Sequence, residues 1–393
     1  MVLSRMTIGA VCTFLILGLQ ACSHNYRLAQ DDLERHSSWP FHRGDLAATG
    51  VAVSGDFADK PFAGKLDVIW ERRESGKPAG PLALSHGILV YPSAKRRIKF
   101  FETLTGRNLG KIRCKGIPQT GMVIQDSLAF FSLSPRKNQL NCINLRNGKT
   151  IWRDRVKDAA SGSIIVNNRL LVGSRTGLLI AYDLNTGEEE WTFQTEGRLI
   201  APAAGDQGVV YQGDDQGVLY ALTPDSGNLR FQVTLDGPLV SAPVLSDLLI
   251  VTDVIGGVYA LDSETGQKVW TTNLDGSIWA APAVSEAKVF IGLTSGYLVA
   301  LNLQTGTELW RYRTEEVVRA APVVIGKNVL VGTLGGKLFC LDVIDGKLLD
   351  QRQLIGAIRQ CPVSDGDRVY VATESGMIVC CGEINETLEQ ALH

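Results

Sequence analysis

A repeat of about 40 residues constrains this 393-residue chain more than any other feature. Turn glycines recur in steps of 42, 39, 40, 39, 40 and 40 residues, at Gly106, Gly148, Gly187, Gly227, Gly266, Gly306 and Gly346. An aromatic residue stands four positions after five of them, at Trp152, Trp191, Phe231, Trp270 and Trp310. So steady a period predicts a fold built from copies of one structural unit.

The unit at 281–313 illustrates what each copy contains. It predicts strands at 281–284, 288–293, 297–302 and 308–313, separated by short turns. The apolar residues alternate as in strands, and no 3.6-residue periodicity indicates a helix. Four antiparallel strands in 40 residues are what one blade of a β-propeller requires, whereas a β-solenoid has a shorter period. The sequence therefore predicts an all-β propeller.

The two ends of the repeat region predict how the ring closes. The last unit, at 362–382, has only three predicted strands, and no tryptophan-bearing fourth strand follows it. A matching strand at 65–74, which contains Trp70, precedes the first complete unit. An N-terminal strand that completes the last sheet leaves no open edge. We therefore expect a single eight-bladed propeller over 64–383, monomeric, with a C-terminal tail at 384–393.

The N-terminus is a separate object. An apolar run at 6–19 follows Arg5 and is too short to span a membrane, as in a secretory signal. The sequence Leu-Gln-Ala-Cys at 19–22 resembles a bacterial lipobox, which implies lipidation of Cys22 and a signal peptide at 1–22. A plain secretory signal with an incidental cysteine is the alternative. Residues 23–63 are expected to form a tether and an irregular lead-in, and Ser23 favours sorting to the outer membrane.

Composition and motifs exclude several function classes. Lys plus Arg is 39 and Asp plus Glu is 41, so no basic field indicates a nucleic-acid partner. The five histidines have no ligand-like spacing, and no nucleophile or phosphate-loop motif is present, so we expect no catalytic residue and no metal site. Asp183, Asp262 and Asp342 share a turn position, where capping of the turn is the expected role.

The repeated pattern Ala-Leu-Asp-x-x-Thr-Gly-x-x-x-Trp, clearest at 260–270, resembles the pyrroloquinoline-quinone (PQQ)-type β-propeller repeat over about 320 residues. The resemblance implies a quinoprotein-like ring in which an aromatic residue docks each blade on its neighbour. The implied docking residues are Trp70, Trp152, Trp191, Phe231, Trp270 and Trp310. Gly110 and Asp350 replace this aromatic residue in two blades, where looser contacts are expected.

Two branches of this superfamily give different functions. One resembles the propeller lipoproteins of outer-membrane β-barrel assembly: a non-catalytic scaffold on the periplasmic face of the outer membrane, anchored through Cys22 and binding protein partners without a cofactor. The alternative is a PQQ-dependent dehydrogenase, or another small-ligand propeller, that binds PQQ with calcium. Such dehydrogenases carry a disulfide between two adjacent cysteines, and Cys380 and Cys381 are adjacent in this sequence. However, cysteines in this chain occupy repeat positions held elsewhere by buried alanines, and adjacent strand residues point to opposite faces.

Two groups of surface residues are candidate binding sites. Trp279, Arg319 and Arg359 share one register before a proline, which predicts a cluster at one mouth of the channel that could bind an anion; a solvated rim is the simpler interpretation. Basic residues replace the glycine turn in the first two blades and follow in the third, at Lys95, Arg96, Arg97, Arg136, Lys137 and Arg175. We expect these residues to form one basic patch on one rim, facing Asp214 and Asp215; it is a candidate partner-binding surface, and a cluster of ordinary solvated charges is the simpler interpretation.

Overall fold

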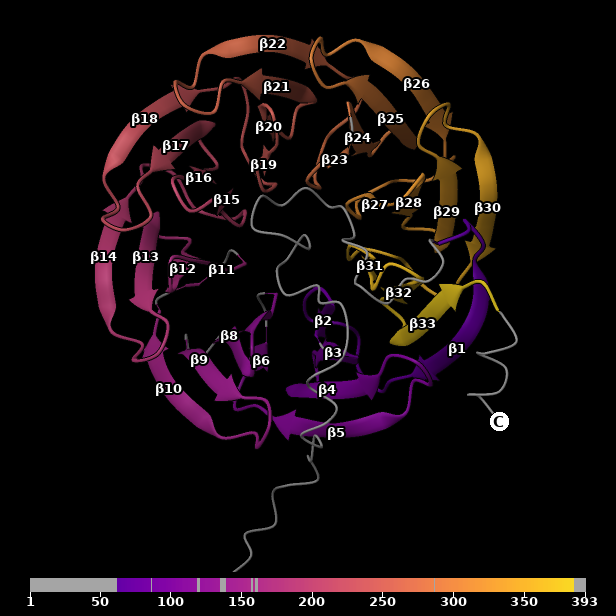
Figure 1. The fold of residues 1–393 in the computed structure, drawn as a ribbon, viewed down its shortest axis with the longest axis horizontal. Helices are drawn as coiled ribbons and strands as arrows, with labels where there is room; N and C mark the ends of the chain where they lie inside the picture. Colours follow the sequence, from indigo (N-terminus) through magenta and orange to yellow (C-terminus); the bar gives the residue numbers. More distant parts are fainter. Residues whose placement is uncertain are drawn as a thin grey trace, which may run out of the picture.

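The computed structural model describes residues 62–85, 87–118, 121–134, 139–156, 158–159, 162–285 and 287–384. These residues form eight β-sheets arranged as blades around a central axis, with no helix among them (Figure 1). Within the described part of the chain, no helix has the length and apolarity needed to cross a membrane. The predicted all-β, eight-bladed propeller is confirmed.

In blades 1 and 3–7 the four strands follow one another from the axis outward in chain order, whereas the outermost strand of blade 8 is β1. Blade 1 contains β2 (Ala83–Ser85), β3 (Ile88–Ser93), β4 (Arg97–Glu102) and β5 (Asn108–Arg113). Blade 2 contains β6 (Ile117–Pro118), β7 (Val123–Gln125), β8 (Leu128–Ser134), β9 (Gln139–Asn144) and β10 (Thr150–Arg155). Blade 3 contains β11 (Ile164–Val166), β12 (Arg169–Gly173), β13 (Leu178–Asp183) and β14 (Glu189–Gln194). Blade 4 contains β15 (Ala204–Gly205), β16 (Val210–Gly213), β17 (Val218–Leu222) and β18 (Leu229–Thr234).

The second half of the ring repeats this plan. Blade 5 contains β19 (Val244–Leu245), β20 (Leu249–Thr252), β21 (Gly257–Leu261) and β22 (Lys268–Asn273). Blade 6 contains β23 (Ala283–Ser285), β24 (Lys288–Leu293), β25 (Tyr297–Asn302) and β26 (Glu308–Arg313). Blade 7 contains β27 (Val323–Ile325), β28 (Asn328–Gly332), β29 (Lys337–Asp342) and β30 (Leu348–Gln353). Blade 8 contains β31 (Val363–Ser364), β32 (Arg368–Ala372), β33 (Met377–Gly382) and β1 (Asp67–Arg73).

Burial explains why the strand sequences differ across a blade. The third strand packs between neighbouring blades on both faces, so Leu298, Val299, Ala300 and Leu301 of β25 are all fully buried. The outermost strand alternates exposed and half-buried residues, because only one of its faces meets the next blade. A register shift between these two strands recurs in all eight sheets.

The N-terminal strand closes the ring as predicted. β1 pairs antiparallel with β33, and Trp70 lies opposite Cys380 (Figure 1). The paired segment begins at Asp67 and ends at Arg73. Because both edges of blade 8 come from opposite ends of the repeat region, the pairing fixes the two ends of the ring to each other.

Blade 2 has an additional strand that the repeat pattern did not predict. β6 and β7 both pair with β8, which makes this sheet five-stranded. β6 also contacts β3 and β4 of blade 1. It therefore lies at an interface where the outermost strand of blade 1 has Gly110 in place of the docking aromatic residue.

Candidate functional site on the loop face

Indole rings dock most blades on their neighbours. The Trp152 Nε1–H on β10 donates a hydrogen bond to the carbonyl oxygen of Leu184 in blade 3, at 2.9 Å. The same bond recurs in four other blades: Trp70 to Thr103, Trp191 to Pro224, Trp270 to Leu303 and Trp310 to Val343, at 2.8 to 3.2 Å. In blade 4 the ring of Phe231 occupies this place without a polar bond.

The turn glycines are required because the rings lie directly beneath them. Gly187 has φ +72°, and a Cβ added there would lie 2.4 Å from the ring of Trp152. The other docking rings stand equally close to Gly106, Gly227, Gly266, Gly306 and Gly346. One repeated pair of residues therefore explains both the glycine and the aromatic residue of the sequence repeat.

One face of the ring gathers two kinds of segment, and we call it the loop face. It consists of the connections between blades, such as 274–282, 314–322 and 354–362, and the turns between second and third strands. Backbone hydrogen bonds join the two kinds: Thr294 to Ser277, Leu334 to Val317 and Glu374 to Ala357, at 2.9 to 3.0 Å. The connections of the loop face are therefore fastened to the turns rather than being independent loops.

The structure brings two of the three channel-mouth candidates together. The guanidinium carbon of Arg319 lies 4.2 Å from the centre of the Trp279 ring, a cation–π contact, and Trp279 is 45% exposed. Arg359 does not join them; it lies 3.7 Å from a carboxylate oxygen of Glu374. The pair Trp279–Arg319 presents an exposed aromatic ring and a cation on the loop face.

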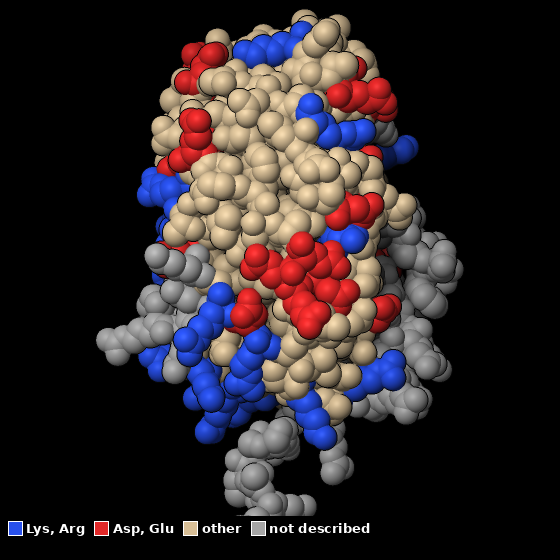
Figure 2. All heavy atoms as spheres, turned by 90° about the vertical axis from the view of Figure 1, so that its left-hand side faces the viewer, with Lys and Arg blue, Asp and Glu red and all other residues tan. Residues whose placement is uncertain are grey.

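The basic candidates are only partly within the described residues. Lys95 and Arg96 are exposed in the β3–β4 turn, Arg97 is half-buried at the start of β4, and Arg175 is exposed in the β12–β13 turn. Arg136 and Lys137 lie outside the described residues, as do Cys22 and the lead-in before residue 62. Figure 2 shows Lys and Arg gathered over the part of the ring where β10 and β5 lie, below a cluster of Asp and Glu.

The acidic counterpart predicted in blade 4 is wrong for Asp214. Its side chain is completely buried and accepts hydrogen bonds from the backbone of Gly197, at 3.0 Å, and from the hydroxyl of Tyr220, at 3.1 Å. Asp215 forms an ion pair with Arg198 at 2.6 Å. Asp214 therefore fastens a turn to a connection, because a buried carboxylate needs such donors, and it is not a surface charge.

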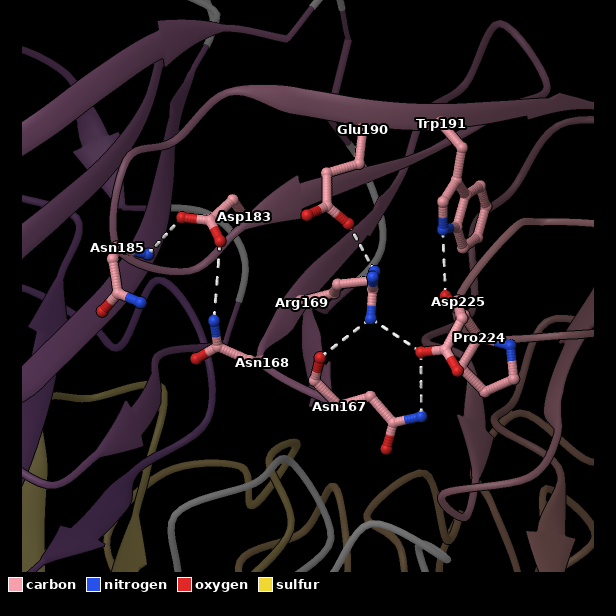
Figure 3. A network of polar contacts seen from close by, with 9 residues as sticks. All are labelled: Asn167, Asn168, Arg169, Asp183, Asn185, Glu190, Trp191, Pro224 and Asp225. Atoms are coloured by element: carbon pink, nitrogen blue, oxygen red, sulfur yellow. Dashed lines mark hydrogen bonds and ion pairs between the residues drawn. The ribbon is translucent and has the colours of Figure 1, made fainter.

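Sequence reasoning missed a polar clamp between blades 3 and 4 (Figure 3). Arg169 of β12 forms ion pairs with Glu190 of β14 and, at 2.7 Å, with Asp225 in the β17–β18 turn. The amide of Asn167 donates to Asp225 at 3.1 Å and to the Gln207 carbonyl oxygen at 2.9 Å. The sequence signal for this turn is the Asn-Asn dipeptide at 167–168, because asparagine tolerates the left-handed φ that both residues adopt.

The blade 7–8 interface also differs from the expectation of a looser contact. Asp350, which replaces the docking tryptophan, accepts a 2.7 Å hydrogen bond from the backbone N–H of Leu66. The amide of Asn328 donates to the Phe62 carbonyl oxygen at 2.9 Å. Leu66 and Phe62 are themselves buried. The incoming chain is thus held by specific polar bonds.

The turn aspartates have the capping role expected of them. Asp262 Oδ1 accepts from the backbone of Glu264 and Thr265, at 3.1 and 2.8 Å, and Asp183 and Asp342 bond their own turns in the same way. Hydrogen bonds from Thr265 hold the pKa of Asp262 below its ordinary value, and bonds from Thr186 do the same for Asp183. These carboxylates are committed to the backbone.

Five of the six described cysteines are buried. Burial raises the pKa of Cys142, Cys340 and Cys381 to about 12. Cys380 and Cys381 are adjacent in β33, completely buried and unbonded to each other. Among the described residues, no group of three or more His, Cys, Asp or Glu side chains is placed to hold a metal ion.

Comparison with known proteins identifies the branch of the superfamily. The family described as outer membrane protein assembly factor BamB matches residues 136–203 and 197–381. A curated relative, outer membrane protein assembly factor BamB of Burkholderia pseudomallei, is 27% identical over 201 residues. That alignment covers 47% of this chain and 51% of the relative, so it spans about half the length of each.

Solved structures agree on the fold. BamB from Moraxella catarrhalis superposes with a TM-score of 0.72 at 19% identity, covering 81% of this chain and all of that one. Quinohemoprotein alcohol dehydrogenase from Comamonas testosteroni gives a TM-score of 0.75 at 13% identity, covering 91% of this chain and 83% of the enzyme. At such identities the structures show a shared propeller, whereas the family match extends over more than half of the sequence. This chain belongs to the BamB family of PQQ-repeat propellers.

Proposed function

We propose that this protein is a non-catalytic scaffold on the periplasmic face of the outer membrane, where it aids the assembly and insertion of β-barrel proteins through protein–protein contacts. The observation that carries this proposal is the family match over residues 136–203 and 197–381. A lipid on Cys22 would anchor the chain, as the lipobox resemblance implies. The partners would be subunits of a β-barrel assembly complex.

The geometry suits a scaffold. A ring closed by β1 holds its loops rigidly, and the turns and connections of the loop face are fastened to each other by backbone bonds. Exposed apolar side chains occur on this face at Ile255, Trp279 and Ile355, each at least 45% exposed. Exposed aromatic and aliphatic residues beside an arginine are typical of the centre of a protein interface.

Recovery of partners tests the scaffold role. The tagged, full-length lipoprotein, isolated from solubilised envelopes, should bring the central barrel subunit with it. A Trp279→Ala, Arg319→Ala variant should recover less of that subunit at unchanged melting temperature. The matched control is Arg311→Ala, which alters an exposed cation on the outermost strand of the same region. If purification at native levels recovers no barrel-assembly subunit, the scaffold proposal is wrong.

The enzyme alternative makes an opposite prediction. We propose that the protein binds neither PQQ nor calcium as a cofactor, and the free, buried Cys380 and Cys381 support this. Purified protein mixed with PQQ and calcium should show no stoichiometric binding by calorimetry and no dye-linked alcohol oxidation. Tight binding with turnover would establish the dehydrogenase instead.

A further inference from the structure

Blade 1 carries an arrangement of charges that the other blades avoid. β4 and β5 pair so that Arg97 lies opposite Arg113 and Lys99 lies opposite Lys111. These four residues, which we call the cation ladder, are two apart on each strand and therefore share one face of the sheet. Opposite residues are about 5 Å apart and successive rungs about 7 Å apart. Of these four cations, Lys99 alone has an ion pair among the described residues, and its partner is Glu74.

The same register in the other seven blades shows that the fold does not require this arrangement. The positions of Lys111 and Arg113 are matched by Arg311 and Arg313 in blade 6, but their partners there are Val299 and Tyr297. In blade 2 the arginines of β10 lie opposite Asn141 and Gln139. In blades 3, 4, 5, 7 and 8 these positions also contain no pair of like charges. Like charges directly opposite each other destabilise a sheet.

A second unfavourable feature stands on the adjoining turn. Arg96 has φ 59°, the left-handed region, at the place where six other blades have a glycine: Gly177, Gly217, Gly256, Gly296, Gly336 and Gly376. A non-glycine residue costs about 1 kcal/mol or more in this conformation. Arg96 and the neighbouring Lys95 are exposed and extend the positive charge onto the loop face. Two destabilising features on one blade both add positive charge to the same surface.

The chemistry of this surface indicates what it binds. The cations stand on an outer edge of the ring, and the strands β4 and β5 expose no large apolar side chain; the exposed Leu104 belongs to the turn at the opposite end of these strands. A stable protein interface needs a desolvated apolar or aromatic centre. A charged bilayer surface does not, because each Lys or Arg near it gains about 1 kcal/mol from the surface potential alone.

We propose that Arg97, Lys111 and Arg113 of the cation ladder, with Lys95 and Arg96, dock the edge of blade 1 onto the anionic phosphate headgroups of a phospholipid bilayer; Lys99 is committed to Glu74. Arg97 and Arg113 suit phosphate oxygens, since guanidinium groups donate paired hydrogen bonds to them. The bound ring stands on its edge, so the loop face lies beside the membrane and stays open to protein partners. This orientation rests on the proposed location at the outer membrane, but the lipid binding itself does not.

Vesicle binding tests the proposal. A chain beginning at Ser23 keeps every described strand of the closed ring and omits the apolar signal. It should sediment with vesicles of phosphatidylglycerol and phosphatidylcholine in low salt, and not with phosphatidylcholine alone. Replacing Arg97, Lys111 and Arg113 by glutamine should weaken this binding about 100-fold, because three cations are removed. The matched control replaces Lys337, Arg311 and Arg313, the same register positions in blades 7 and 6, and should bind as the parent does.

Stability gives an independent readout. Without lipid, Arg96→Gly and the Lys111→Gln, Arg113→Gln pair should each raise the melting temperature, while lowering vesicle binding. If these residues only stabilise the fold, the same substitutions should lower the melting temperature and should not lower vesicle binding. Failure of the parent to bind anionic vesicles, or equal loss in the blade 6 and 7 control, would overturn the proposal. Tighter binding to a poly-glutamate peptide than to vesicles would assign the surface to an acidic protein, and displacement by free glycerol phosphate at constant ionic strength would assign it to a soluble phosphate. Either result would also overturn it, whereas the partner pull-down judges the scaffold function separately.

Discussion

The interfaces between blades 2 and 3 and between blades 7 and 8 solve one packing problem in different ways. At the first, the Trp152 ring lies under Gly187 and its Nε1–H bonds the neighbouring turn. At the second, blade 8 has no turn between its third and outermost strands, because β33 and β1 come from opposite ends of the ring. Asp350 therefore meets the backbone N–H of Leu66 instead of a glycine turn.

This difference shows that the residue at the docking position of each blade depends on which group of the next blade lies against it. A turn with an open glycine accepts a flat aromatic ring, which removes apolar surface from water. An incoming chain offers an unpaired N–H, which a carboxylate accepts strongly. The blade 1–2 interface is a third case, in which Gly110 contributes no side chain and the extra strand β6 lies between β8 and blade 1.

The largest effect should come from removing the closing strand. Deleting 65–74 leaves blade 8 with three strands and an exposed edge of β33. We expect loss of cooperative unfolding and strong aggregation, measured by calorimetry and light scattering. A deletion protein that melts like the parent would show that the pairing of β1 with β33 does not hold the ring together.

The aromatic interface should be the next most sensitive. Trp152→Ala removes a ring that is 9% exposed, together with its hydrogen bond, and should destabilise the protein by about 3–5 kcal/mol in denaturant titrations. Gly187→Ala attacks the same contact from the other side, through φ +72° and the clash with the ring. Gly326→Ala is the control, since it has φ +56° but no atom within 4 Å of an added Cβ. Equal losses at Gly187 and Gly326 would attribute the effect to backbone strain alone.

Substitutions at the blade 7–8 interface should reduce stability less, and their effect should depend on the loss of the hydrogen-bond acceptor rather than on side-chain size. Asp350→Ala leaves the half-buried N–H of Leu66 without its acceptor and should cost about 1–3 kcal/mol. Asp350→Asn keeps an oxygen acceptor and should cost less. Asp345→Ala, which removes an exposed cap of a turn in the same blade, is the comparison. If Asp350→Ala unfolds no more easily than Asp345→Ala, the hydrogen bond between Leu66 and Asp350 does not contribute to stability.

The smallest effect concerns pH. The folded-state pKa values of Asp183 and Asp262 are lowered, so their contribution is present above the ordinary aspartate pKa of about 4 and is lost as pH falls through the lower folded value. Blade 6 already caps this turn with Asn302, which does not titrate. Asp183→Asn with Asp262→Asn should therefore flatten the decline of melting temperature below about pH 4 and change it little at pH 7. An unchanged acid slope would contradict this assignment.

The sequence by itself determined the features that repeat. The 40-residue period, the turn glycines with their aromatic partners and the three-stranded last unit gave the eight-bladed ring and its closure by 65–74, because these signals are local and recur in register. It also placed the capping aspartates and the buried cysteines, since equivalent positions in other blades show what each site tolerates.

Only the tertiary structure decided the features that occur once. Asp350 and Leu66 are 284 residues apart, and Arg169 meets Asp225 across a blade boundary, so no local pattern pairs them. Asp214 resembles a surface charge until its buried donors are seen. The cation ladder depends on a cross-strand register in which one residue's shift would turn Lys111 and Arg113 to the other face of the sheet. Periodicity fixes which segments form strands, whereas long-range pairing fixes which side chains face one another.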